Sequence, residues 1–184
     1  MKESLTEKIY TELRDEILKG EITPRQFISE SQIAQRYQVS KAPVKQALKI
    51  LAGQGYLTSY PRKGYQVSTY SVEEVNQIQQ VRRCLESLCV KLAIQNASDE
   101  EIRSLQMYEG MDTENLDPRG TINTIFHNRL AEISGNEFLP ETLRPLILKS
   151  TMSNIRSAPD TEHFEKIVQA MLDRNEELAV KLIC

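Results

Sequence analysis

The sequence predicts a mostly α-helical protein built from two parts, residues 1–69 and residues 70–184. Apolar residues recur at helical spacing through most of the chain, and strand character is confined to one short hairpin pattern near residue 60. The charge is also unevenly divided. Residues 1–69 hold 11 Lys and Arg against 7 Asp and Glu, whereas residues 70–184 hold 12 against 19. A basic part joined to an acidic part favours a polyanion as the partner of the first.

Two helices are predicted first. Residues 4–20 begin with a capping-box pattern at Ser4 to Glu7 and end at Lys19-Gly20, which are typical helix start and stop signals. A turn containing Pro24 follows. A second capping box, Ser29 to Gln32, then opens a short helix.

A third helix is predicted from Lys41 to Gly53, with Ser40 as its N-cap and Pro43 tolerated in its first turn. One side is apolar. The other side carries lysines at i, i+4 and i+8, which weaken the helix slightly and so suggest a role outside folding. The alternative is an ordinary solvated lysine face. These lysines are Lys41, Lys45 and Lys49.

Residues 56–60 and 65–69 are rich in aromatic and β-branched residues and flank a turn, Pro61 to Gly64, so they predict a β-hairpin. Three short helices followed by a hairpin predict a winged helix-turn-helix, whose third helix lies in the major groove of double-stranded DNA. Arg62 and Lys63 would then bring two cations to phosphates or to the minor groove.

The whole N-terminal pattern resembles the GntR family of bacterial transcription regulators, in one order and spacing over nearly all of residues 5–69. The resemblance is carried by residues 17–24, 28–34, 39–48 and 51–57, together with Gly64 in the wing.

The resemblance implies a set of DNA-facing positions. They are Ser31, Ser40, Lys41, Ala42, Lys45 and Gly64. The family commonly has Arg at the positions of Lys41 and Lys45, and often Thr at that of Ala42. Lysine offers a point charge where arginine offers a bidentate fork, so we expect a similar docking pose with a different base preference.

The acidic part is predicted to be an all-α bundle of about six helices. The first, from Ser71 to about Asn96, has an apolar pattern that predicts Val75, Ile78, Val81, Leu85, Leu88 and Leu92 on its inward face. The remaining helices are predicted at about 98–108, 121–134, 140–156 and 161–183, the last broken near 173–175. Residues 109–119 are predicted to be an acidic connection.

This part resembles a shortened FCD-type effector domain, as found in the FadR-like branch of the same family. The matching pieces are residues 81–86, 92–93, 123–127, 134–136 and 162–171.

The FCD resemblance implies a divalent metal site. In the family an acidic residue and three histidines bind the ion, and here Asn123, His127 and His163 fall on three of these positions. The fourth position would come after Cys184. Imidazole ligands favour zinc or nickel. Because Asn123 is uncharged and the ligand set is incomplete, we expect weak binding or none; the alternative is that both histidines are ordinary bundle residues.

Arg82 has two interpretations. The resemblance implies that it meets the carboxylate of a small effector, whereas its spacing from Glu86 predicts an i, i+4 ion pair at the surface.

The sequence leaves three candidate functions. The first is a homodimeric, cytoplasmic, DNA-binding regulator, most simply a repressor, controlled by a small carboxylate effector. The second is a DNA-binding dimeriser whose degenerate effector domain senses nothing. The third is a metal-dependent enzyme, against which stands the lack of recognisable catalytic motifs. No apolar run approaches the length of a membrane helix and no signal peptide is recognisable at Met1.

Overall fold

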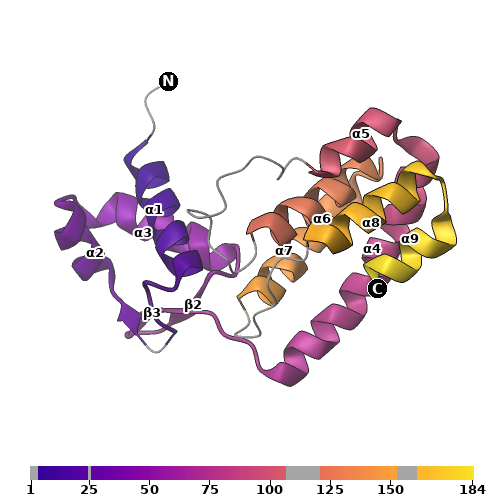
Figure 1. The fold of residues 1–184 in the computed structure, drawn as a ribbon. Helices are drawn as coiled ribbons and strands as arrows, with labels where there is room; N and C mark the ends of the chain where they lie inside the picture. The colour runs from indigo at the N-terminus through magenta and orange to yellow at the C-terminus, as the bar shows by residue number, and fades with distance from the viewer. Residues whose placement is uncertain (1–3, 25, 107–120, 153–160) are drawn as a thin grey trace. The chain divides into compact units, whose positions relative to one another are not determined.

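The computed structural model describes residues 4–24, 26–106, 121–152 and 161–184, and in these it is mostly helical as predicted. It divides into two compact units, Met1–Tyr70 and Ser71–Cys184. Figure 1 shows the three helices and small sheet of the first unit and the helices of the second. No helix in the described ranges has both the length and the apolar character needed to cross a membrane.

The first unit contains three helices, α1 (Leu5–Lys19), α2 (Glu30–Tyr37) and α3 (Lys41–Gly53). Helix α1 starts at Ser4, whose hydroxyl accepts a hydrogen bond from the Glu7 amide. The apolar stripes of α1 and α3 pack together and are completely or almost completely buried. These residues are Ile9, Leu13, Ile17, Val44, Ala47, Leu48 and Leu51.

The predicted hairpin is present as β2 (Leu57–Tyr60) and β3 (Gly64–Val67), but the sheet has a third strand that the sequence did not reveal. Strand β1 (Phe27–Ile28) pairs antiparallel with β3, giving the order β1-β3-β2. Two residues are too few to show a period-two pattern, so the sequence predicts no strand at Phe27–Ile28.

Gly64, the first residue of β3, lies very close to the backbone of β1. Its φ is +100°, and a Cβ atom at this position would lie 2.4 Å from the Ile28 carbonyl oxygen. Only glycine fits such a backbone without strain and without displacing the neighbouring strand. Gly64 therefore has a structural role, whether or not it also faces DNA.

The second unit contains α4 (Val72–Asn96), α5 (Asp99–Arg103), a 3-10 turn η1 (Ser104–Gln106), α6 (Thr121–Ile133), α7 (Phe138–Thr151), α8 (Thr161–Leu172) and α9 (Glu176–Ile183). Its described residues contain no strand. Helix α7 starts before Pro140 and continues through Pro145. The predicted connection 109–119 and residues 153–156 of the predicted fourth helix lie outside the described residues.

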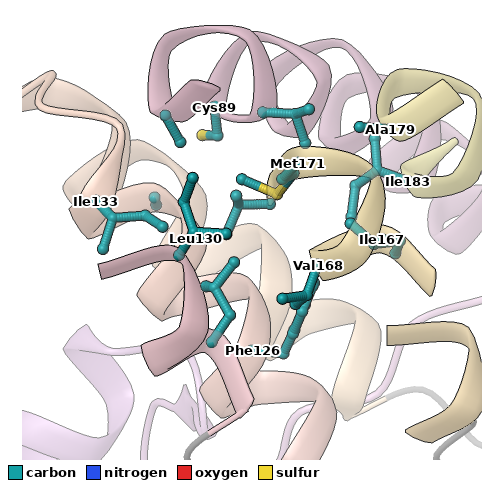
Figure 2. Packing of buried hydrophobic residues seen from close by; sticks show 14 of the residues in the cluster. Cys89, Phe126, Leu130, Ile133, Ile167, Val168, Met171, Ala179 and Ile183 are labelled. Carbon is teal, nitrogen blue, oxygen red and sulfur yellow. The ribbon is translucent and has the colours of Figure 1, made fainter. Parts of the chain in front are cut away.

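One apolar core joins α4, α6, α7, α8 and α9 (Figure 2). In this view Cys89 of α4, Phe126 and Leu130 of α6, and Met171 of α8 point into the same space. The rings of Phe126 and Phe164 stack with their centroids 4.3 Å apart. The dense packing means that α4 presents a single, well-defined face to its neighbours.

The predicted inward face of α4 was wrong in part. Val81 and Leu88 are 50% and 41% exposed, whereas Arg82 and Glu86 are each only 3% exposed. Helix α4 carries apolar side chains on two faces, so its pattern alone did not identify the one that packs. The face that does pack consists of Val75, Arg82, Glu86, Cys89, Val90 and Ala93.

We expect Gly64→Ala to destabilise the first unit by about 1–2 kcal/mol or more, because the new Cβ atom combines positive φ with a clash against Ile28. Urea unfolding followed by circular dichroism measures this. Gly53→Ala is the matched control, since nothing lies within 4 Å of its added Cβ atom. It should leave stability unchanged or slightly raised. Equal effects from both variants would contradict the proposed role of Gly64.

Candidate nucleic-acid interface and buried polar cluster

Helix α3 presents an exposed cationic face opposite its buried stripe. Lys41, Lys45 and Lys49 are all exposed, and none forms an ion pair with any described residue. Ala42 is exposed beside them, and Ser31 is exposed on α2. A row of cations without counter-ions is costly to keep within a folded protein alone but suits a surface that meets phosphate groups.

Ser40 stands at the N-cap of α3 in an extended conformation, yet its side chain makes no capping hydrogen bond. An N-cap oxygen accepts from the amide of the second or third helical residue, and the third residue here is Pro43, which has no amide hydrogen. Ser29, Ser71 and Ser98 all form complete capping boxes. The exposed Ser40 hydroxyl therefore remains available to an external partner.

The tip of the hairpin holds two exposed cations in a defined turn. The Lys63 amide donates to the Tyr60 carbonyl oxygen at 3.1 Å, with Pro61 and Arg62 between them. Arg62 has a φ of +64°, in the left-handed region that side chains other than glycine seldom adopt. Backbone strain at an exposed arginine is typical of a residue placed for function rather than for stability.

The second unit encloses a buried polar cluster between α4 and α6. Arg82 donates from Nε and Nη2 to one oxygen of Glu86, Oε1, at 2.9 and 2.7 Å. His127 Nδ1 lies 3.1 Å from the same oxygen, although without hydrogen-bond alignment to any described residue. The predicted Arg82–Glu86 pair is thus confirmed, but it is buried and not at the surface.

Glu86 is the charged centre of this cluster. Burial alone would raise the pKa of its carboxyl group, but the attraction of His127 and Arg82 outweighs burial and holds the pKa below its ordinary value. Cys89, one helical turn further, has its thiol pKa raised to about 12 by burial and by the charge of Glu86. A thiol so strongly protonated is unreactive. Cys89 is therefore a packing residue of the apolar core.

The described residues do not fit a metal site of the four-ligand type. His163 Nε2 lies 2.8 Å from the Leu182 carbonyl oxygen of α9, while Nδ1 of His127 faces Glu86. Among the residues that the structure describes, no three His, Cys, Asp or Glu side chains come together as an ion would require. Asn123 lies one turn before His127 on α6. The assignment of Asn123, His127 and His163 to a metal stays a prediction.

Comparison with known protein families agrees with these two units. Residues 5–67 match the model of the bacterial regulatory proteins of the gntR family, and residues 77–184 match the FCD domain. The chain belongs to the GntR family. Its second unit is an FCD domain that includes every residue of the buried cluster.

Individual relatives share a quarter to a third of their aligned residues with this chain. The chain is 30% identical to the HTH-type transcriptional regulator YdhC of Bacillus subtilis over 74% of its own length, but spans only 63% of YdhC. It is 25% identical to the HTH-type transcriptional repressor RspR of Escherichia coli, over 83% of this chain and 68% of RspR.

Among solved structures, McbR/YncC of E. coli superposes with a TM-score of 0.72 at 21% identity, over 97% of this chain and 91% of that one. At this level of identity the likeness concerns the fold. It supports the arrangement of a winged helix-turn-helix and a C-terminal helical domain in one chain.

The structure also identifies residues that the sequence analysis missed. The i, i+4 spacing predicts Glu86 as a partner of Arg82, but only at the surface, and the burial of the pair was missed. Phe27 and Tyr60 were not selected at all. They lie on β1 and β2 with ring centroids 5.5 Å apart, and no sequence pattern places residues 33 positions apart in contact.

Replacing Glu86 with Gln should lower the free energy of unfolding by about 3–5 kcal/mol, because it leaves the buried Arg82 guanidinium without a counter-ion. Chemical denaturation of the purified protein measures this. Glu162→Gln is the matched control, since Glu162 pairs with Lys166 at i+4 on a largely exposed surface. Its effect should stay below about 1 kcal/mol. If Glu86→Gln lowered the free energy of unfolding as little as the control does, the buried pair would not be needed for stability.

Proposed function

We propose that this chain is a DNA-binding transcription regulator, acting as a repressor, in which α3 lies in the major groove of the operator and the wing reaches the neighbouring phosphates. The supporting observation is the combination of exposed lysines on α3, which have no ion-pair partner among the described residues, with a Ser40 hydroxyl that makes no capping hydrogen bond. The match of residues 5–67 to the gntR family model supports the same function. The relative RspR, a transcriptional repressor by name, supports the direction of control.

The DNA-facing residues of this proposal are those expected from the sequence. Seven of them are exposed, and the eighth, Gly64, is half-buried at the start of β3. Lysines and the wing cations would contact phosphates and supply most of the affinity, while Ser31, Ser40 and Ala42 would lie against base edges. The full set is Ser31, Ser40, Lys41, Ala42, Lys45, Arg62, Lys63 and Gly64.

We also propose that the chain acts as a homodimer through its second unit. One face of α4 carries Val81, Cys84 and Leu88 at i, i+3 and i+7, and all three are exposed. An apolar stripe left uncovered on a long helix is typical of an interface between subunits. Two copies related by a two-fold axis would read two operator half-sites.

We further propose that a small effector acts at the cluster of Arg82, Glu86 and His127. A small carboxylate that binds Arg82 must share that guanidinium with Glu86, which already accepts two of its hydrogen bonds. The same observation favours the alternative function, a dimeric DNA-binding protein whose second unit senses nothing. A library of small carboxylates tested for release of the protein from DNA distinguishes the two.

The experiment that tests DNA binding is selection of bound sequences from a random DNA pool, followed by gel shifts with the enriched sequence. Lys45→Ala and Lys41→Ala should each weaken binding by about tenfold at low salt. The loss should become smaller as salt rises, since each lysine neutralises a phosphate. Lys8→Ala removes the same charge from α1 and is the control. Wild-type affinity in both α3 variants would exclude the proposed docking.

Light scattering at micromolar concentration tests the oligomeric state, and we expect a dimer. Leu88→Glu combined with Val81→Glu places two carboxylates in the apolar stripe and should give a folded monomer, because a buried unpaired charge is costly. Glu162→Gln serves again as the control and should remain a dimer. A monomeric wild-type protein, with and without DNA, would contradict this proposal.

A further inference from the structure

The outer face of the wing sheet carries an exposed aromatic pair. Phe27 of β1 and Tyr60 of β2 meet edge to face, with centroids 5.5 Å apart and planes at 79°. Phe27 and Tyr60 are 37% and 40% exposed, which is unusual for large aromatic residues in a folded unit. Neither ring belongs to the buried core of the first unit. Burial therefore does not explain why two large aromatic side chains occupy this position.

Lys63 at the tip of the wing lies against this pair. Its Nζ atom is 5.9 Å from the centroid of the Phe27 ring, within the range in which a cation is attracted to an aromatic face. Lys63 is exposed, and it has no ion-pair partner among the described residues. Among the residues that the structure describes, the Phe27 ring is the group that lies against this ammonium group.

The backbone around Lys63 is restricted as well. The turn from Tyr60 to Lys63 is closed by a hydrogen bond, and Arg62 is held at positive φ. Gly64 joins β3 to β1 in a contact too close for any other residue, so the strand that bears Phe27 is fixed relative to the tip. The backbone that bears the Phe27 ring and the backbone that bears Lys63 therefore belong to one structural element.

We propose that Phe27 and Tyr60 form an aromatic seat that positions the Lys63 ammonium group for contact with a DNA phosphate, a role that rests on the proposed DNA-binding function. Arg62 and Lys63 are adjacent cations on a basic unit and have no ion-pair partner among the described residues, so a phosphodiester backbone is the complementary partner. A lysine that is already oriented loses less rotational freedom when it binds than a freely moving one does. Phe27 and Tyr60 act through Lys63, so they are positioning residues.

The first test uses the free protein. The face of an aromatic ring shields nearby protons, so the ε-methylene protons of Lys63 should resonate upfield of the usual lysine position in an NMR spectrum. Phe27→Leu keeps an apolar side chain but removes the ring, and it should return these protons to the ordinary position. Amide chemical shifts of the other residues report whether the variant remains folded. An ordinary shift in the wild-type protein would overturn the proposed seat.

The second test measures affinity for the selected operator by fluorescence anisotropy over a range of salt concentrations. Lys63→Gln should lower the slope of log K against log salt by about one, the value for one phosphate contact. Phe27→Leu should weaken binding about two- to fivefold and lower the slope in the same direction. The double variant should bind no more weakly than Lys63→Gln alone, since both changes remove one contact.

Tyr60→Phe keeps the ring and loses only the hydroxyl group, so it is the matched control and should bind like the wild type. Additive losses in the double variant, or weaker binding by Phe27→Leu without a change in slope, would overturn the positioning role and indicate a direct contact of the ring. Wild-type binding by Phe27→Leu would also overturn it. Failure of the DNA-binding function itself is distinguishable, because then the wild-type protein and Lys45→Ala would both fail to bind a specific sequence.

Discussion

The ion pair between Arg82 and Glu86 decides how the second unit is built. Two charged side chains can enter an apolar core only together, because each alone would incur a large desolvation penalty. Their i, i+4 spacing places both on one face of α4, and His127 of α6 meets the same carboxylate oxygen. Once this pair faces inward, the rotation of α4 about its axis is fixed. Val81 and Leu88 must then face outward.

This constraint explains which parts of the structure the sequence could predict. Helix positions were largely predictable because they depend on local signals, such as the capping boxes at Ser29, Ser71 and Ser98. The orientation of α4 was not. Its apolar residues cover two faces, and sequence patterns count charged residues as outward-facing, whereas the observed packing depends on a partner contributed by α6. Strand β1 was missed for a related reason, since its pairing with β3 is a long-range contact.

The candidate DNA surface was more predictable than the buried cluster because it depends on exposure and charge, which the sequence displays directly. Exposed positions such as Lys41 and Lys45 follow from the buried stripe on the opposite side of α3. The absence of a capping hydrogen bond from Ser40 is less evident from the sequence, where the one relevant signal is that Pro43 has no amide hydrogen to donate. Contacts across the sheet, such as that of Phe27 with Tyr60, could not be inferred before strand register was known.

The two units differ in how their charged side chains are paired. In the first unit the cations of α3 and the wing tip have no counter-ion among the described residues, so their charge is available to an external polyanion. In the second unit Arg82 has an internal counter-ion, and its charge is not available unless Glu86 yields it. The binding free energy of an anion at this cluster is therefore only the difference between two interactions with Arg82. One is the interaction that the anion makes, and the other is the interaction with Glu86 that it displaces. A regulator built in this way would bind DNA readily and would respond only to an effector that satisfies both members of the buried pair.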